Sequence, residues 1–445
     1  MKGTSPSFRM ITLGCKVNQY ESAFLSESLV EYGFLRAPDN ERADIVIINT
    51  CTVTGTASKQ SRQSIRKAIK ENPGAFVAAV GCYVQAFPEE LGQIEGISLL
   101  TGNNDKKDLP FLIRKAFQEN LSKNHTRPFH AGQAFEQMPV RLFAGRARAF
   151  LKIQDGCEAF CSYCIVPKAR GPSRSLDPEK AVSVMEEMAV HGICEVVLTG
   201  IHLGRYGRDL SPKISLASLL RKVTERRLPL RIRLSSIEPN EIDDEIIGLV
   251  RKEPCICPHF HIPLQSGDDA ILRCMNRHYS TDQFESLIEN IRSRIPFCAI
   301  GVDVISGFPG ESEKAFMNTF SLIRSLPITY LHVFPFSPRK GTPAASFAGR
   351  VEPADIRART GLLRALGREK RDAFHKSFLG KTLEVVSEGI SKEEEDLLCG
   401  TSDNYIPVLF VPLDSKAADG IKMVKAACLR GQKVLGKEIT CPYPV

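Results

Sequence analysis

Three closely spaced cysteines constrain the fold of this chain more than any other feature. They are Cys157, Cys161 and Cys164, in the run Asp155-Gly-Cys-Glu-Ala-Phe-Cys-Ser-Tyr-Cys-Ile165. Three thiolates on one tight loop can hold three irons of a 4Fe-4S cubane, which leaves the fourth iron without a protein ligand. Zinc or a role without metal is the alternative, but a closed zinc site needs four ligands, and no matching second pair lies nearby. The loop therefore predicts a 4Fe-4S cluster with one iron open for catalysis.

Length and composition indicate more than one globular domain. The chain has 445 residues, of which 43% are hydrophobic and 25% charged, and this is too long for one ordinary core. No apolar run approaches the ~20 residues of a membrane-spanning helix, and Met1 to Met10 is too polar for a signal peptide. We therefore expect a cytoplasmic protein with no membrane partner.

The cysteine content agrees with a reducing compartment. The chain has 14 cysteines and no export signal, so we expect thiols that serve metals or catalysis and not disulfides. Cys255 and Cys257 form the one further suggestive pair, and for these we favour ordinary buried residues.

Positive residues are clustered although the net charge is only +8. One group surrounds the cysteine loop and consists of Arg141, Arg146, Arg148, Lys152, Lys168, Arg170 and Arg174. A second group lies between residues 357 and 371. Such clusters suit RNA, although a solvated helix face explains the second group equally well. We expect an RNA partner and no DNA partner.

Cysteines also follow three predicted strands near the start of the chain. The runs Phe8 to Leu13, Asp44 to Asn49 and Ala75 to Val80 each precede a segment that can form a helix. This alternation predicts an open parallel α/β sheet, which binds ligands beyond the carboxyl ends of its strands. Neighbouring strands would bring together the thiols that follow them, which are Cys15, Cys51 and Cys82. A second three-thiol metal site is one interpretation, and ordinary buried cysteines are the other.

The rest of the chain predicts two further folded parts. Six strand-like runs between Ala149 and Pro335 alternate with helical segments and predict a partial (βα)6 barrel, with chemistry at the carboxyl ends of its strands. From Gly380 onward, short strands separated by turns predict a small antiparallel β-barrel. The predicted domains are 1–117 for the amino-terminal sheet, 118–142 for a linker, 143–376 for the partial barrel and 377–441 for the small barrel.

The cysteine loop resembles the signature of the radical S-adenosylmethionine (SAM) superfamily, which has this spacing and an aromatic residue before the third cysteine. The resemblance implies that the open iron binds SAM and that Tyr163 lies against the adenine. The stretches His261-Ile-Pro-Leu-Gln-Ser-Gly267 and Gly307-Phe-Pro-Gly-Glu311 resemble the SAM-pocket strands of the family. The SAM contacts carried over from this resemblance are Gly200, Ser235 and Gln265.

The segments Thr12-Leu-Gly-Cys-Lys-Val-Asn-Gln-Tyr-Glu-Ser22 and Asn49-Thr-Cys-Thr-Val-Thr54 resemble the methylthiotransferases, a radical SAM family. That resemblance implies a second 4Fe-4S cluster on Cys15, Cys51 and Cys82. Gly14-Cys-Lys-Val-Asn18 is similar to the bacterial branch that acts on threonylcarbamoyladenosine in tRNA, and the small barrel resembles the RNA-binding TRAM module of the family. Relatives acting on isopentenyladenosine or on a ribosomal-protein aspartate differ just after the first cysteine.

The resemblance implies transfer of a methylthio group to C2 of N6-threonylcarbamoyladenosine beside the anticodon. The implied partners are the tRNA anticodon loop, an electron donor such as flavodoxin or ferredoxin, and a sulfur source. One alternative is a methylthiotransferase for isopentenyladenosine in tRNA or for a ribosomal-protein aspartate. An alternative of another class is a non-catalytic RNA-binding iron-sulfur sensor.

Overall fold

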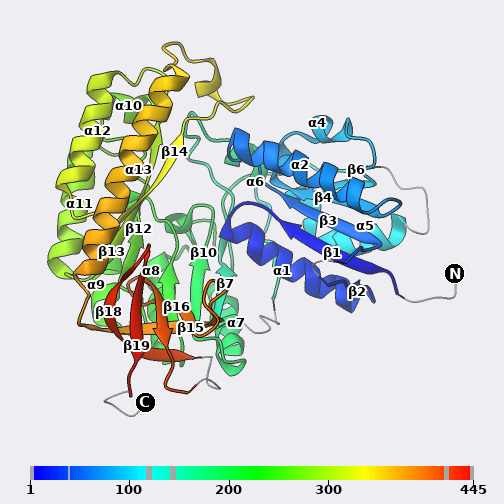
Figure 1. The fold of residues 1–445 in the computed structure, drawn as a ribbon. Helices are drawn as coiled ribbons and strands as arrows, with labels where there is room; N and C mark the ends of the chain where they lie inside the picture. The colour runs from blue at the N-terminus through cyan, green and yellow to red at the C-terminus, as the bar shows by residue number, and fades with distance from the viewer. Residues whose placement is uncertain (1–4, 39–40, 117–122, 141–146, 415–419, 441–445) are drawn as a thin grey trace. The chain divides into compact units, whose positions relative to one another are not determined.

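The computed structural model describes residues 5–38, 41–116, 123–140, 147–414 and 420–440 (Figure 1). The chain divides into two compact units. The amino-terminal unit comprises Met1–Phe143, Lys152–Leu176 and Ser337–Ser346. The barrel unit comprises Ala144–Leu151, Asp177–Phe336 and Phe347–Val445. In the described part of the chain, no helix has both the length and the hydropathy that crossing a bilayer requires.

A six-stranded parallel sheet in the order β2-β1-β3-β4-β5-β6 forms the centre of the amino-terminal unit. The strands of this sheet are β1 (Ser7–Thr12), β2 (Leu35–Arg36), β3 (Ile45–Thr50), β4 (Phe76–Gly81), β5 (Leu99–Thr101) and β6 (Asn124–His125). The other elements of this unit are α1 (Lys16–Glu31), α2 (Gly55–Glu71), α3 (Cys82–Ala86), α4 (Pro88–Gly92), η1 (Asn103–Asp108), α5 (Leu109–Ala116), β8 (Gln154–Asp155), α6 (Val166–Arg170), β9 (Arg174–Ser175) and η4 (Pro343–Ser346). The open parallel sheet predicted from the sequence is confirmed.

Alternation along the central strands builds a core on each face of this sheet. In β3, Ile45 and Ile47 pack on the face that α1 covers, where Leu25 lies. Val46 and Ile48 pack on the opposite face with residues of α2. Figure 1 shows α1 and α2 on opposite sides of the sheet. Because both faces are covered, β3 is buried along its whole length, as parallel strands usually are.

Three short strands extend the sheet beyond the three that the sequence predicts. β2, β5 and β6 are only two or three residues long, so hydrophobic periodicity does not reveal them. β6 lies inside 118–142, the predicted linker, and pairs with β5. Residues 118–122 and 141–142 of that interval lie outside the described residues. The domain boundaries proposed from the sequence remain predictions.

Two three-stranded sheets form the open barrel of the barrel unit, in the orders β11-β10-β7 and β12-β13-β14. Single bridges between Ile232 and Ile256 and between Ser236 and His261 connect the two sheets. The strands are β7 (Arg148–Lys152), β10 (Glu195–Thr199), β11 (Arg231–Leu234), β12 (His259–His261), β13 (Ala299–Ser306) and β14 (Tyr330–Pro335). The predicted partial barrel is confirmed, although β12 has only three residues.

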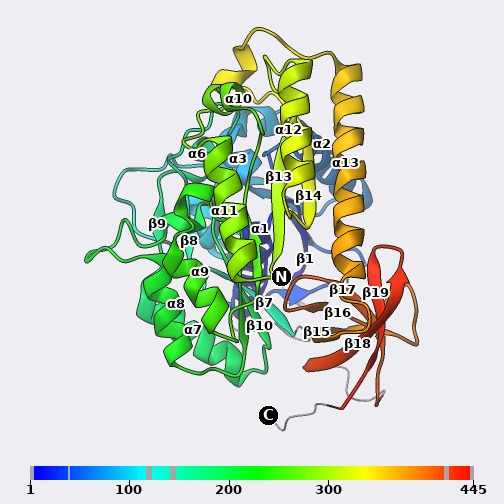
Figure 2. The same cartoon turned by 90° about the vertical axis from the view of Figure 1, so that its left-hand side faces the viewer.

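Helices cover the outer face of the open barrel, as Figure 2 shows for α11, α12 and α13 beside β13 and β14. The helical elements are α7 (Pro178–Val190), η2 (Leu203–Arg205), α8 (Leu216–Glu225), η3 (Pro239–Glu241), α9 (Asp244–Lys252), α10 (Asp269–Cys274), α11 (Thr281–Arg294), α12 (Glu313–Ser325) and α13 (Pro353–Lys376). Side chains on alternate residues therefore point either to these helices or to the interior of the open barrel, here called the lumen. In β13, Ile300 and Val302 are buried, whereas Asp303 is partly exposed.

A closed five-stranded barrel in the order β15-β16-β17-β19-β18 ends the described chain. Its strands are β15 (Thr382–Ile390), β16 (Leu398–Ser402), β17 (Pro407–Val411), β18 (Ile421–Arg430) and β19 (Lys433–Glu438). The predicted small barrel is confirmed; four of its neighbouring strand pairs are antiparallel, and β17 and β19 are parallel. A closed ring with an odd number of strands cannot alternate direction throughout, so one neighbouring pair must be parallel. Closure removes exposed sheet edges.

Candidate active site

Three cysteines meet at the carboxyl edge of the amino-terminal sheet. Cys15 caps α1 after β1, Cys51 follows β3, and Cys82 begins α3 after β4. Because β1, β3 and β4 are neighbours, the predicted convergence of these thiols is confirmed.

Two glycines allow this close approach. Gly14 has φ +97°, and a Cβ built there would lie 2.9 Å from Cys51 Sγ. Gly81 has φ +98°, and a Cβ there would lie 2.5 Å from Oδ1 of Asn49. A left-handed backbone is readily accessible to glycine and strained for other residues. Each glycine directly precedes a cysteine, so the backbone itself is shaped to present two of the three thiols.

Burial controls the chemistry of these thiols. Cys51 and Cys82 are both 5% exposed, whereas Cys15 is exposed. Burial, with repulsion from Cys82, raises the pKa of Cys51 to about 12. This thiol is therefore protonated at neutral pH without a metal, and metal binding must release its proton. The donor set suits an iron-sulfur cluster, because thiolates are its usual ligands.

The second cysteine set lies on the loop between β8 and α6 of the same unit. The backbone N–H of Cys157 donates to O of Gly171 at 3.0 Å, and that of Cys164 donates to O of Cys161 at 2.9 Å. A Cβ on Gly156 would lie 1.9 Å from a backbone oxygen of Pro172, so only glycine fits there. Cys161 is buried, whereas Cys157 and Cys164 are half-buried. These contacts hold a compact loop on which two of the three cysteines are only partly covered.

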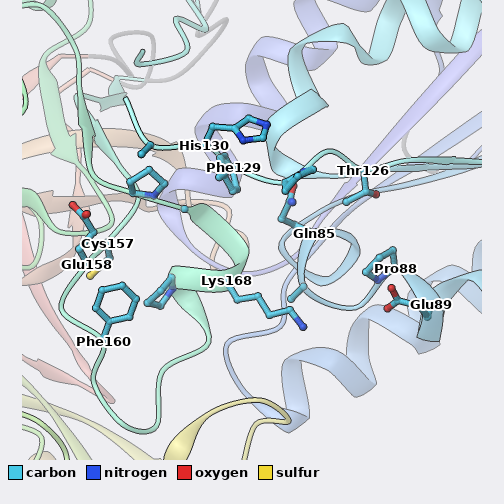
Figure 3. A pocket seen from close by; sticks show the side chains of 16 residues that line it. Gln85, Pro88, Glu89, Thr126, Phe129, His130, Cys157, Glu158, Phe160 and Lys168 are labelled. Atoms are coloured by element: carbon cyan, nitrogen blue, oxygen red, sulfur yellow. The ribbon is translucent and has the colours of Figure 1, made fainter. Parts of the chain in front are cut away.

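A groove of about 580 Å³ opens beside the cysteine loop (Figure 3). Cys157 and Phe160 line it from the loop, and Phe129 lines it from the segment after β6. Phe160 is 62% exposed and has φ 46°, so the loop presents an aromatic ring to solvent at its tip. Lys168 of α6 contributes a cation to the same groove. The sequence did not predict this groove, because its walls come from distant segments.

The predicted SAM contacts lie in the barrel unit, at or beyond the carboxyl ends of its strands. Gly200 follows β10 and Ser235 follows β11. Gln265, at φ 62°, rejoins the sheet through a bridge with Val304. Within the described residues, the buried hydroxyls of Ser235 and Ser306 have no hydrogen-bond partner. Buried polar groups normally have partners, so this edge fits a bound ligand with polar groups such as SAM. Tyr163 belongs to the amino-terminal unit and is half-buried on the cysteine loop.

Sequence reasoning missed a polar layer on the lumen side of the open barrel. His261 Nε2 lies 2.8 Å and His332 Nδ1 3.3 Å from Oδ1 of Asp303. Burial alone would raise the pKa of Asp303, but hydrogen bonds from the two histidines outweigh it and hold this pKa below its usual range. Only the strand register brings these residues together, because they come from β12, β13 and β14.

Comparison with known proteins gives the family. Residues 7–102 match a family described as Uncharacterized protein family UPF0004, and residues 151–323 match the Radical SAM superfamily. Threonylcarbamoyladenosine tRNA methylthiotransferase MtaB of Bacillus subtilis (strain 168) is 39% identical over 402 residues, which cover 90% of this chain and 89% of that protein. The chain belongs to the radical SAM tRNA methylthiotransferases. The protein therefore uses SAM and carries two iron-sulfur clusters, as the members of this family do.

Other relatives of this methylthiotransferase differ in their named substrate. MtaB of Aquifex aeolicus (strain VF5) is 37% identical over 402 residues, covering 89% of this chain and 95% of that protein. A tRNA-2-methylthio-N(6)-dimethylallyladenosine synthase of Clostridium botulinum is 32% identical over 436 residues, covering 95% of both chains. The structure of the radical SAM methyltransferase TsrM from Kitasatospora setae matches with TM-score 0.58 at 17% identity, covering 77% of both chains, and this match concerns the fold alone.

Proposed function

We propose that this radical SAM enzyme transfers a methylthio group to C2 of N6-threonylcarbamoyladenosine beside the anticodon of tRNA. The observation that carries the proposal is the presence of two three-cysteine sites in one compact unit. The substrate rests on five relatives named threonylcarbamoyladenosine tRNA methylthiotransferase, which are 33% to 39% identical to this chain.

Cys157, Cys161 and Cys164 would hold the cluster that reacts with SAM. When bound, this cluster and SAM supply a 5'-deoxyadenosyl radical able to remove hydrogen from an unactivated ring carbon, which no side chain can do. The chain's own task is to fix the loop, through Gly156 and its contact with the 171–172 backbone, and to orient SAM. The groups proposed to contact SAM are Tyr163, Gly200, Ser235 and Gln265.

Cys15, Cys51 and Cys82 would hold the second cluster, which would supply the site for the sulfur atom that carries the methyl group. Their placement at a sheet edge agrees with a site that must admit both a sulfur donor and a nucleotide. The target adenosine must leave its stack to reach the site, and single-stranded anticodon loops allow this at low cost.

The carboxy-terminal barrel is the proposed tRNA-binding surface, in the role that the TRAM module has in the family. Lys425 of β18 and Lys437 of β19 are exposed cross-strand partners. Like charges directly opposite each other are destabilising, and a phosphate between them would relieve the repulsion. The same barrel carries an acidic run, Glu393 to Asp396, which would repel phosphate. This run is partly neutralised, because Glu393 pairs with Lys433 and Glu394 pairs with Arg430. Arg141 and Arg146, also expected near RNA, lie outside the described residues.

Two further partners complete the proposal. An electron donor such as flavodoxin or ferredoxin would reduce the cluster on the cysteine loop, and the groove with the exposed ring of Phe160 is the proposed entry side. A separate sulfur source would supply the transferred atom. Both partners and tRNA imply a cytoplasmic location.

Mass spectrometry of tRNA nucleosides tests the substrate. Cells lacking the gene should lose the methylthio group from threonylcarbamoyladenosine, and only an active gene should restore it. Wild type and Cys428→Ser, which changes an exposed cysteine of the small barrel, should complement; Cys157→Ala and Cys51→Ala should not. An unchanged nucleoside profile, in cells without a redundant enzyme, would reject this substrate.

A second candidate substrate is N6-dimethylallyladenosine in tRNA. It is favoured by relatives named for that product, which are 31% and 32% identical to this chain. The same spectra separate the two candidates, because the two methylthio nucleosides differ in mass. Loss of the dimethylallyl product alone would favour the second candidate.

A further inference from the structure

A group of buried charged side chains lies in the amino-terminal unit next to the edge that carries Cys15, Cys51 and Cys82. Each of its side chains is no more than 9% exposed. The group, here called the buried charge cluster, consists of Glu21, Lys106, Lys152, Asp155, Arg170 and Arg174. Glu21 and Lys106 come from α1 and η1, and the other four members come from β7, β8, α6 and β9, which are close together in the sequence.

The contacts within the buried charge cluster leave an excess of positive charge. Glu21 accepts from Lys106 at 2.5 Å, from Lys152 at 3.0 Å and from Arg170 at 2.5 Å. Asp155 lies 3.2 Å from Lys152, 3.4 Å from Arg170 and 3.7 Å from Arg174. Four cations thus surround two carboxylates, a formal net charge of 4 − 2 = +2 in the described residues.

Glu136, a further acid beside the buried charge cluster, interacts with Lys107 and more weakly with Lys152. Glu136 pairs with Lys107 at 3.3 Å, which forms a neutral pair of its own. Burial lowers the pKa of Lys106, whereas Glu21 and Asp155 raise the pKa of Lys152 and, together with Cys82, that of Arg170. Each of the four cations has a carboxylate partner, but they share only two carboxylates, so an anion beside them would complete the charge balance of the buried charge cluster.

Two amides connect the buried charge cluster to the thiols. Arg170 Nη2 donates to Oδ1 of Asn18 at 2.6 Å, and this oxygen lies 4.0 Å from Cys82 Sγ. Asn18 Nδ2 donates to the backbone oxygens of Leu13 and Thr50, at the ends of the strands that precede Cys15 and Cys51. One asparagine therefore ties Arg170 to all three cysteine segments.

Asn103 makes the most direct contact with a thiol. Its Nδ2 donates to Cys82 Sγ at 3.3 Å and to the backbone oxygen of Ala169 at 2.7 Å. Ala169 directly precedes Arg170 in α6, the helix that follows the other cysteine loop. The short helix α6 thus supplies the cation of Arg170 and, through the Ala169 oxygen, an acceptor that holds the Asn103 amide of η1 on the Cys82 side of the site.

We propose that Arg170 and Asn103 are positioning residues for the iron-sulfur cluster on Cys15, Cys51 and Cys82, and that they raise its reduction potential. Thiolate ligands make such a site anionic, and this anion is the counter-charge that would complete the charge balance of the buried charge cluster. Positive charge nearby and N–H donors to sulfur both stabilise the more negative, reduced state. The inference rests on the proposed assignment of these three cysteines.

A redox titration of the full-length chain tests the inference. The Cys157→Ala, Cys161→Ala, Cys164→Ala background leaves only the amino-terminal cluster, whose midpoint potential is followed by electron paramagnetic resonance after anaerobic reconstitution. Arg170→Gln should lower the midpoint potential by at least about 59 mV, which corresponds to a tenfold change in the equilibrium constant of a one-electron reduction. Asn103→Leu should lower it by a smaller amount. Arg170→Lys, which keeps the charge, should stay close to the background protein.

Lys152→Gln is the matched control, because it removes one charge from the same cluster at a residue that does not contact Asn18. Its potential should change less than that of Arg170→Gln. Equal potentials in all variants with full iron content would overturn the inference. If Arg170→Gln loses its iron while Arg170→Lys keeps it and both are folded by circular dichroism, the counter-charge role is supported. Equal iron loss in Arg170→Gln, Arg170→Lys and Lys152→Gln would show that these residues support the site only through packing and not through their charge. A background protein that binds no iron would instead contradict the cysteine assignment.

Discussion

Arg233 and Glu195 form a doubly hydrogen-bonded ion pair on neighbouring strands of the open barrel. Nε of Arg233 lies 2.9 Å from Oε1 and Nη2 lies 2.7 Å from Oε2, and both side chains are fully buried. Arg233 also donates to the backbone oxygens of Ser402 and Asp403. The pair therefore connects strands β10 and β11 of the open barrel to the end of β16 in the small barrel, and both barrels belong to the same unit.

Replacing Arg233 should destabilise the barrel unit strongly. Arg233→Met leaves Glu195 with fewer cations and removes the contacts to Ser402 and Asp403, so we expect a loss of about 3–5 kcal/mol. Urea unfolding of the metal-free protein measures it. The control is Arg226→Met, because Arg226 forms an exposed ion pair with Glu186. This substitution should lower the free energy of unfolding by less than ~1 kcal/mol. Equal losses of stability in the two variants would show that the buried ion pair stabilises the fold no more than the exposed pair does.

Acid should weaken the fold through Glu195. Burial would raise the pKa of Glu195, but Arg233, Arg148 and Arg231 outweigh it and hold the pKa well below its ordinary value. The unfolded chain, with a glutamate pKa of ~4.3, then takes up the proton first, so this contribution is present above about pH 4.3 and is lost as pH falls further. Urea midpoints between pH 5 and pH 3 should fall more steeply for wild type than for Glu195→Gln. Parallel curves would contradict the assignment.

Gly14 should be required for the amino-terminal cluster. Gly14→Ala combines a left-handed backbone with a contact of 2.9 Å to Cys51 Sγ, so it should displace that thiol. We expect the reconstituted protein to lose about half of its iron while it still cleaves SAM. Gly33→Ala is the control, since Gly33 has φ +88° with open space around its Cβ position. Iron content equal to wild type in Gly14→Ala would disprove the prediction.

Loss of either cysteine set should abolish a different step of the reaction. Cys157→Ala should abolish formation of 5'-deoxyadenosine, because its cluster is the proposed partner of SAM cleavage. Cys51→Ala should retain that product but form no methylthio nucleoside, because the proposed sulfur site is lost. Chromatography of both products from one reductive assay measures this. Methylthio transfer by either variant would count against the assignment.

Lys425 and Lys437 should contribute to tRNA affinity through phosphate. The double variant Lys425→Ser, Lys437→Ser should bind tRNA more weakly, and the slope of log affinity against log salt should decrease by about 1 per lysine. Filter binding at several salt concentrations measures the slope. Lys252→Ser, an exposed lysine at the end of α9, should leave it unchanged. An unchanged slope in the double variant would place the tRNA elsewhere.

Much of the fold could be predicted from local pattern. The runs before Cys15, Cys51 and Cys82 lie within one residue of β1, β3 and β4. β3 and β4 are buried almost throughout, and such parallel strands need a continuous apolar run. The two- and three-residue strands could not be predicted in this way. Asn103 was missed for the same reason, since it follows β5, which is too short to show a period.

The sequence by itself determined the cysteine loop, the strands that end in cysteines and the resemblance to radical SAM methylthiotransferases, because these depend on residue type and local spacing. Only the tertiary structure decided which side chains surround the thiols. The strand order made Cys15, Cys51 and Cys82 neighbours, and the packing of α6 brought Arg170 and Asn103 together beside them. Such contacts join segments more than 60 residues apart, and no local period encodes them; they arise from burial of apolar faces and from the cost of unpaired buried charge.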